Sequence, residues 1–415
     1  MRRGLKYRLY PNEQQAVLIH KTVGCARLIY NAELDDYKKQ LELQEHKPKL
    51  KEITHFKQQY DFLKEVDSLA LANAKVNLNN ALQNFFKSRD RKRKGKRCGF
   101  PQFHTKNKTK WRYTTNNQGG SVRLDVENNK IKLPKLGWVS IELHRVVEGD
   151  IYSCTVEATR DGKYYVSLNV EVTEKVKQKD FDLNNLKVVG LDMSLSSFVV
   201  SSENDLDDTK TKYIKQYRKN ERKLQRLQRQ LSNKQKGSVN GDKARERLAK
   251  HHGYVSNCRK DYCHKLSRHY ASHYDVIVLE DLNMQDMSRS LHLGKSVHDL
   301  GFGLFRSMLS YKCAEEDSIV MYADKWYASS KLCNHCGEKN SLLQLSDREW
   351  ACPHCGAVLD RDFNASCNLR DYYYTIINTA GTAGIQACRD VASTLRETLV
   401  QVMSAKQEAP SFRWG

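Results

Sequence analysis

The sequence predicts a multidomain α/β protein with a small β-barrel and a metal-binding insertion. A chain of 415 residues is long enough for two to four domains. Hairpin signals and alternating residues fill the stretch from about 110 to 175, whereas helical periodicity occurs before and after it. Two closely spaced cysteine pairs follow near the C-terminal end. These three observations predict separate helical, β-rich and metal-bound parts.

Charge and cysteine usage limit the class of protein. The excess of 70 Lys and Arg over 49 Asp and Glu gives a formal net charge of +21, which predicts a polyanionic partner because neutralised phosphates release counterions. No apolar stretch approaches the roughly 18 residues that a membrane span needs, and the first residues lack the apolar core of a signal peptide. We therefore expect a cytoplasmic protein, located at the nucleoid when it binds DNA, whose 12 cysteines are thiols or metal ligands rather than disulfides.

The N-terminal part reads as a strand followed by helices. Residues 5–11 alternate as a strand does and stop at Pro11, after which Asn12 and Gln15 form a capping box for a helix. A second helix over 69–86 has an apolar face and an opposite stripe of asparagines: Asn73, Asn77, Asn80 and Asn84. Asparagine can pair with adenine in a major groove, but a solvated or inter-helix polar seam is the slightly favoured interpretation.

A basic run at 87–99 follows this helix. It includes four consecutive cations: Arg91, Lys92, Arg93 and Lys94. A solvated loop is one interpretation, but the phenylalanines on either side favour contact with a nucleic-acid backbone.

The central part changes from β to α. Turns at Asn128-Asn129 and Asp161-Gly162, with alternating residues around them, predict the hairpins of a small barrel. Leucine periodicity over 210–274 predicts a basic helical hairpin with a Gly/Ser/Lys-rich turn. The last residues, SAKQEAPSFRWG, show no periodicity and are expected to be loosely ordered.

Two Cys-x2-Cys-Gly units predict a zinc ribbon. They provide Cys333, Cys336, Cys352 and Cys355, with 15 residues between the pairs. Four thiolates suit tetrahedral Zn2+, and the glycines permit the tight turns around it. Because a closed four-cysteine shell leaves no open position, the zinc is expected to be structural.

Three carboxylates follow apolar strands or open a helix. Asp192 ends the strand in KVVGLD, Glu280 ends the strand in DVIVLE, and Asp362 precedes a helix. Each alone has an ordinary explanation, such as a helix cap or a solvated strand end. Together they form the pattern of a ribonuclease-H-type nuclease, in which converging carboxylates need divalent cations, and Mg2+ is the expected ion.

The motifs together resemble TnpB, the family of transposon-encoded RNA-guided DNA endonucleases related to type V CRISPR effectors. YRLYPNEQQ and GCARLIYN resemble its N-terminal region; GLDMSL, VLEDLNM and DRDFNA resemble its three nuclease motifs; YASSKLCNHCG resembles its zinc ribbon. The resemblance runs over essentially the whole chain. It implies a split RuvC-like nuclease with Asp192, Glu280 and Asp362 as catalytic residues and ligands of two Mg2+ ions, and Asp360 as secondary.

The resemblance also implies a domain organisation. A β-barrel wedge domain comprises 1–10 and 105–180, and a helical recognition lobe at 11–104 is inserted in it. The RuvC-like nuclease comprises 181–324 and 358–380, the zinc ribbon is an insert at 325–357 that binds target nucleic acid, and 381–415 is a tail.

The implied partners are a guide RNA and double-stranded target DNA beside a short T-rich motif, with the transposase of the same element as a further candidate. Lys75, Asn77 and Asn80 are candidates for reading that motif, and both strands would be cut by one site. A miniature type V CRISPR effector and a guide-directed DNA-binding repressor that does not cut are the alternatives.

Overall fold

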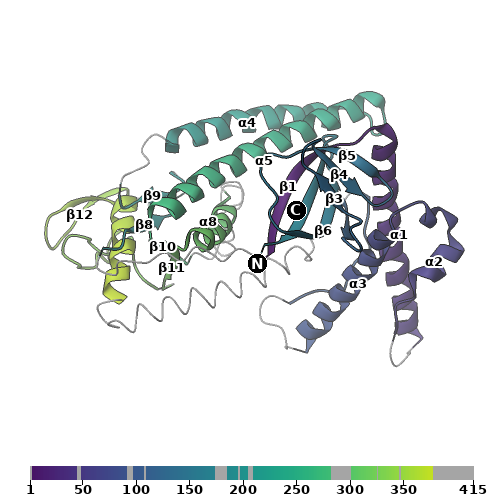
Figure 1. Cartoon of the computed structure of the whole chain (residues 1–415). Helices are drawn as coiled ribbons and strands as arrows, with labels where there is room; N and C mark the ends of the chain where they lie inside the picture. The colour runs from purple at the N-terminus through teal and green to yellow at the C-terminus, as the bar shows by residue number, and fades with distance from the viewer. Residues whose placement is uncertain are drawn as a thin grey trace. The chain divides into compact units, whose positions relative to one another are not determined.

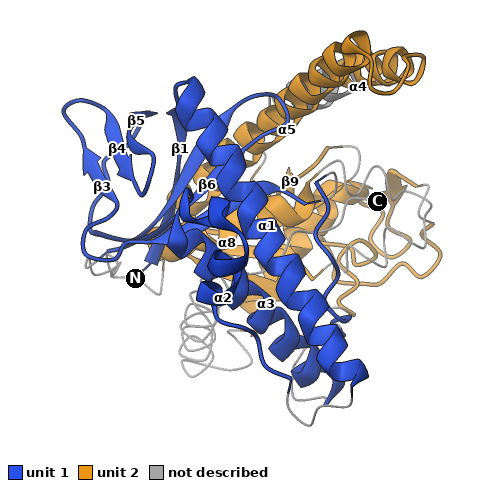
Figure 2. Ribbon diagram, turned by 90° about the vertical axis from the view of Figure 1, so that its right-hand side faces the viewer, with its two compact units in different colours: residues 1–174, 404–415 blue, residues 175–403 orange. Residues whose placement is uncertain are grey.

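The computed structural model describes residues 2–43, 48–90, 97–106, 109–172, 185–194, 197–203, 209–281, 301–324, 326–344 and 347–376 (Figure 1). The chain divides into two compact units, whose described parts lie within 1–174 and within 175–403 (Figure 2). The predicted loosely ordered tail lies outside the described residues. Within them, no helix combines the length and the apolar character that crossing a membrane requires.

The first unit contains a seven-stranded sheet in the order β2-β6-β7-β1-β5-β4-β3. Its strands are β1 (Arg2–Tyr10), β2 (Trp111–Asn116), β3 (Arg123–Asp125), β4 (Lys130–Leu133), β5 (Gly137–Glu142), β6 (Asp150–Ala158) and β7 (Tyr164–Glu171). The N-terminal strand β1 is therefore central, between β5 and β7, and pairs antiparallel with both. No ladder joins the edge strands β2 and β3 in the described chain, so the predicted barrel is not closed by backbone hydrogen bonds; β3 has only 3 residues and pairs with β4.

The predicted alternation and turns are present in this sheet. Val166, Leu168 and Val170 of β7 are completely buried, whereas the residues between them are partly exposed. Asn129 and Gly162 have φ angles of 49° and 76°, the left-handed conformation that asparagine and glycine tolerate in such turns. The sheet therefore buries one face, as the period of two predicts.

The helices of the first unit are α1 (Glu13–Glu42), α2 (Ile53–Gln59), the short 3-10 helix η1 (Asp61–Lys64) and α3 (Ser68–Arg89). The predicted capping box opens α1: the Gln15 backbone N–H donates to Asn12 Oδ1 at 2.8 Å, and the Asn12 N–H donates to Gln15 Oε1 at 3.0 Å. The predicted apolar face of α3 is buried at Leu71, Ala74, Leu78 and Leu82, and Phe85 is half-buried.

The second unit is built on a four-stranded sheet in the order β11-β10-β8-β9. Its strands are β8 (Val188–Asp192), β9 (Val200–Ser201), β10 (Val276–Glu280) and β11 (Ile319–Ala323). β8, β10 and β11 are parallel, and β9 is antiparallel to β8. Residues 276–279 of β10 are completely buried, as expected for a central parallel strand. The two strands predicted to end in carboxylates are therefore neighbours.

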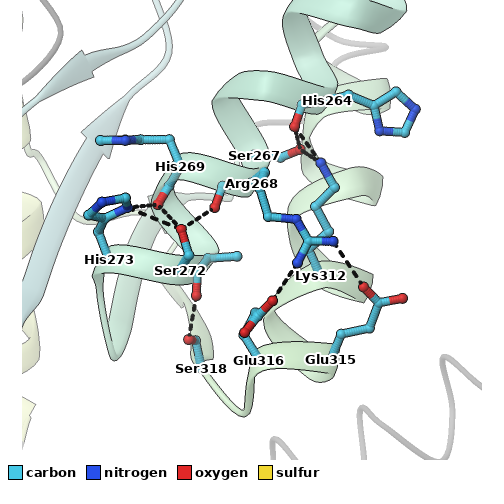
Figure 3. A network of polar contacts seen from close by, with 11 residues as sticks. His264, Ser267, Arg268, His269, Ser272, His273, Lys312, Glu315, Glu316 and Ser318 are labelled. Carbon is cyan, nitrogen blue, oxygen red and sulfur yellow. Dashed lines mark hydrogen bonds and ion pairs between the residues drawn. The ribbon is translucent and has the colours of Figure 1, made fainter.

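Helices α4 (Thr209–Ser232), α5 (Val239–His273) and α8 (Phe302–Glu316) belong to the same unit, and α4 and α5 are the predicted hairpin. A polar network joins α5 to α8 (Figure 3). Its centre is Lys312, only 3% exposed, which donates to Ser267 Oγ at 2.8 Å and to the His264 carbonyl oxygen. Burial lowers the pKa of Lys312 to about 8. Arg268 bridges to Glu315 and Glu316 at the rim, so the network fixes α8 against α5.

The remaining elements are a hairpin of β12 (Glu349–Ala351) and β13 (Val358–Asp360), followed without a break by a helix over 361–376. This helix buries Ala365, Leu369 and Tyr373 and half-buries Tyr372 and Ile376, which is the face that the sequence predicts.

Candidate active site and metal centre

The parallel strands place two predicted acids at one edge of the sheet. β8 and β10 pair in the register Leu191 with Leu279. The next residues, Asp192 and Glu280, therefore lie side by side at the ends of the two strands. The carboxyl edge of a parallel sheet is where α/β proteins place ligands and catalytic groups. The strand ends that the sequence singled out are thus adjacent in space.

Gly190 brings the third acid to the same place. A Cβ atom at this position would lie 2.0 Å from the Ser366 carbonyl oxygen and 2.5 Å from the Arg370 backbone nitrogen. The helix over 361–376 therefore packs directly on β8, at a distance that only glycine allows. Asp362 is in the first turn of this helix, at the end nearer the ribbon hairpin.

The charges of the other two predicted acids act on Asp192. The pKa of Asp192 is raised to about 8, first by burial and then by the negative charges of Asp362 and Glu280. Burial also raises the pKa of Glu280. Like charges in one partly buried site destabilise each other's ionised forms. A divalent cation would relieve this repulsion, and carboxylate oxygens are the ligands that Mg2+ prefers. The residues present therefore fit a magnesium site.

Two arginines that the sequence did not single out contact Asp362. Arg348 Nη1 lies 3.1 Å from Asp362 Oδ2, and Arg361 Nη2 lies 3.4 Å from Asp362 Oδ1. Arg361 also opposes the rise in the pKa of Asp192. Arg348 comes from the insert between the two cysteine pairs. Only its place in the fold reveals its contact with Asp362, because an arginine directly before a short hairpin strand carries no recognisable signal.

Asp360 and Asp362 have different roles in the structure. The Asp360 side chain accepts a hydrogen bond from the Phe363 backbone N–H at 2.7 Å, which caps the helix. Asp362 instead raises the pKa of Asp192 through its charge. The secondary role of Asp360 in catalysis stays a prediction.

The four predicted cysteines converge into one cluster. Cys333, Cys336, Cys352 and Cys355 place their sulfur atoms within 4.8 Å of one another, with Cys333–Cys355 and Cys336–Cys352 separations of 3.7 Å. A tetrahedron with Zn–S bonds of about 2.3 Å has edges of about 3.8 Å. Among the described residues, the three carboxylates are not grouped within this limit. The cysteines therefore form a preassembled tetrahedral site.

Backbone hydrogen bonds shape both knuckles in the same way. The Gly337 N–H donates to the Cys333 carbonyl at 2.8 Å, and the Gly356 N–H donates to the Cys352 carbonyl at 2.9 Å. Both glycines have positive φ, 77° and 72°. The Cys355 backbone N–H, pointing at the Cys352 sulfur, contributes most to lowering the pKa of that thiol to about 6, whereas burial and the neighbouring sulfurs leave the pKa values of Cys336 and Cys355 raised in the metal-free cluster. A lowered thiol pKa favours the thiolate that binds metal.

Asparagines attach the ribbon to the helix that carries Asp362. Asn364 Oδ1 accepts from the Asn334 N–H at 2.9 Å, and Asn364 Nδ2 donates to the Leu332 carbonyl. Asn368 Nδ2 donates to the Ser329 and Leu332 carbonyls, both at 2.7 Å. Both asparagines are nearly buried, so these bonds are shielded from water and strengthened. Hydrogen bonds therefore link the segment of the four-cysteine cluster to the helix that carries Asp362.

The nucleic-acid candidates of the first unit are only partly described. Lys75 forms an ion pair with Glu52 at 2.9 Å. Asn77 is exposed and Asn80 is half-buried, whereas Asn73 donates to the Thr114 carbonyl at 2.9 Å. The asparagine stripe is thus an internal seam at one end and accessible farther along α3. The four cations Arg91, Lys92, Arg93 and Lys94 lie outside the described residues.

Comparisons with known proteins agree with this arrangement. The family model described as "Helix-turn-helix domain" matches residues 1–46, "Probable transposase" matches 167–291, and "Cas12f1-like, TNB domain" matches 302–369. The described residues of the first match form strand β1 and the single helix α1. The third match contains the four cysteines, Arg348 and Asp362.

Two curated relatives extend over most of the chain. A protein of Streptomyces pristinaespiralis named "Putative RNA-guided DNA endonuclease" is 31% identical over 99% of this chain and 96% of its own length. A protein of Escherichia coli strain K12 named "Putative RNA-guided DNA endonuclease InsQ" is 29% identical over 88% of this chain and 91% of its own. The solved structure titled "Cryo-EM structure of the Cas12f1-sgRNA-target DNA complex" has a similar fold, with a TM-score of 0.50 and 12% identity over 89% of this chain and 98% of that one.

Proposed function

The chain belongs to the TnpB family, and on this premise we propose that it is an RNA-guided DNA endonuclease encoded by a transposon. The single observation that carries the nuclease proposal is the placement of Asp192 and Glu280 at the ends of neighbouring parallel strands, with the helix of Asp362 packed on Gly190 of the first strand. The names of its relatives support the guide RNA and DNA as partners, and the net charge of +21 supports the binding of both.

The three carboxylates would hold two Mg2+ ions, which would activate a water molecule and stabilise charge on the leaving oxygen of the phosphodiester. The protein's own groups set up this chemistry. β8 and β10 fix Asp192 and Glu280 at the sheet edge, and the helix packed on Gly190 fixes Asp362. Arg348 neutralises Asp362 in the protein alone. Its guanidinium is also well placed to contact a phosphate group that enters beside that carboxylate.

The finer parts of the proposal concern the target. Base pairing with the guide would select the sequence, and the protein would read a short T-rich motif beside it. Asn77 and Asn80 on the accessible part of α3 are the proposed readers, together with Lys75 once it leaves Glu52. One carboxylate site would cut both strands in turn.

The test is cleavage of a matched duplex by guide-loaded protein in Mg2+, alongside a binding assay. Asp362→Ala should lower cleavage of both strands by roughly a hundredfold or more, while target binding is retained. Asp360→Asn is the matched control, since asparagine also caps helices and this substitution removes a neighbouring charge without touching the proposed site. Cutting by Asp362→Ala at the wild-type rate, or loss of only one strand's cut, would contradict the single site. A wild-type protein that binds target but never cuts would support the repressor alternative.

A further inference from the structure

Trp326 is unusually exposed for a tryptophan. Its side chain is 85% exposed, whereas Trp350, in the same C-terminal half of the second unit, is 7% exposed. Exposing an indole in water loses the burial energy that normally holds tryptophan inside a fold. A large exposed aromatic residue that contributes nothing to a core is informative when it lies at a functional site.

The position of Trp326 places it at the edge of the sheet that carries the acids. β11 pairs in parallel with β10 in the register Ala323 with Glu280. The chain therefore leaves β11 beside Glu280 and reaches Trp326 three residues later. The same edge receives the end of β8 with Asp192. Trp326 is thus on the connection that borders the carboxylate site.

The backbone that carries Trp326 is held in place by several bonds. The Trp326 N–H donates to Asp324 Oδ1 at 2.8 Å, and the Tyr327 N–H donates to the Asp324 carbonyl at 2.9 Å. The Tyr327 hydroxyl donates to the Asn368 carbonyl at 3.0 Å, and its ring contacts Tyr372 at a centroid distance of 4.7 Å. Asn368 and Tyr372 belong to the helix of Asp362. The turn is therefore fixed on that helix while it presents the indole to solvent.

A cation lies at the same edge. Arg306 Nη2 contacts Asp281 Oδ1 at 3.1 Å, one residue beyond Glu280, and the Arg306 guanidinium lies 4.5 Å from the centre of the Tyr322 ring. An exposed aromatic ring and an arginine beside an acidic site are the groups that bind single-stranded nucleic acid, through base stacking and phosphate contacts. A protein partner would leave the neighbouring carboxylates unexplained.

We propose that Trp326 stacks on an unpaired base of the DNA strand that enters the carboxylate site, and so positions the phosphodiester to be cut. Trp326 is then a positioning residue for the strand, and it does not take part in the chemistry itself. This inference rests on the proposed nuclease function. It adds a residue that holds the incoming strand by a base next to the bond.

Cleavage gives the first test. Guide-loaded Trp326→Ala should cut a matched target roughly 5- to 100-fold less efficiently than wild type, from the usual value of one stacked base. The loss should appear mainly as a higher concentration of substrate for half-maximal rate. Trp326→Phe should recover most of it, because a smaller ring still stacks. Val239→Ala is the control, since Val239 is an exposed apolar residue, 71%, at the start of α5 and outside the ribbon insert. It should cut as wild type does.

Fluorescence gives the second test and separates the two proposals. The fluorescence of a single-stranded oligonucleotide carrying 2-aminopurine should be quenched when it binds the cleavage-inactive Asp362→Ala protein. The quenching should be absent in the double variant that carries both Asp362→Ala and Trp326→Ala. If wild-type protein does not cut at all but this quenching depends on Trp326, the nuclease proposal fails while the stacking proposal stands. Cleavage and quenching that are both unchanged in Trp326→Ala would overturn the stacking proposal and leave the nuclease intact.

Discussion

Replacing Asp192 by asparagine should stabilise the metal-free nuclease unit at pH 8 while it abolishes cleavage. Burial and the charges of Asp362 and Glu280 raise the pKa of Asp192 from 3.8 to about 8. A carboxyl group with a raised pKa binds more protons in the folded state than in the unfolded state. The free energy of unfolding contributed by Asp192 is therefore highest below about pH 4 and falls as the pH rises through the window up to about 8.

The structure sets the magnitude of this effect. Each pKa unit corresponds to about 1.4 kcal/mol, so a shift from 3.8 to about 8 would amount to about 6 kcal/mol for a fully shielded group. Asp192 is half-buried, and solvent screening reduces the value. We expect about 2 to 3 kcal/mol between pH 5 and pH 8. Asparagine has nearly the same shape and an oxygen that can keep the bond from the Met193 backbone, so Asp192→Asn should remove the pH-dependent cost with little loss of packing.

The assay is hydrogen exchange at the amides of β8 and β10 in EDTA at pH 5 and pH 8, which reports the local free energy of unfolding without assuming a two-state transition for the whole chain. Asp261→Asn is the control, because Asp261 is an exposed carboxylate on α5 that pairs with Lys265 at 2.8 Å. Mg2+ should stabilise wild type at pH 8 and fail to stabilise Asp192→Asn. Equal stabilities of wild type and Asp192→Asn at both pH values would refute a strained carboxylate cluster.

Three further predictions concern the other sites. Cys352→Ser should lower bound zinc and thermal stability together, as metal analysis and calorimetry would show; a metal-free, fully active protein would contradict the zinc site. The four consecutive cations of the basic run are Arg91, Lys92, Arg93 and Lys94. Replacing all four by alanine should weaken nucleic-acid binding and flatten its salt dependence without moving the cut. An unchanged salt dependence would assign the run to a solvated loop. Asn77→Ala and Asn80→Ala should reduce cleavage selectively at targets with the preferred flanking motif, and a loss of stability alone would identify the stripe as a polar seam.

Most helices, strands and turns were predictable from the sequence because each depends on residues that are close together in the chain. The capping box of Asn12 and Gln15, the buried face of α3 and the glycine turns of the two knuckles depend on neighbouring residues, and the structure confirms them. The four cysteines were predictable from spacing alone, since a tetrahedral metal fixes the ligand number and type.

Contacts between distant segments were not predictable in this way. Closure of the seven-stranded sheet into a barrel stays a prediction, because pairing between its edge strands β2 and β3 would depend on contacts that alternation does not encode. Arg348 and Trp326 carry no local pattern, and only the fold places them beside the carboxylates. Gly190 appeared to be an ordinary strand residue, although its missing side chain is what allows the helix of Asp362 to approach.

The direct passage from β13 into the helix of Asp362 has a consequence for synthesis on the ribosome. The strands that carry Asp192 and Glu280 leave the ribosome well before the third acid, which follows Cys355, the last of the four clustered cysteines, by seven residues. Domains generally begin to fold as they emerge. If Asp362 completes the site, the unfinished chain has only two of the three acids and no nuclease activity. The third acid is synthesised only after both cysteine knuckles. A nascent or truncated product would therefore be harmless to the DNA around it.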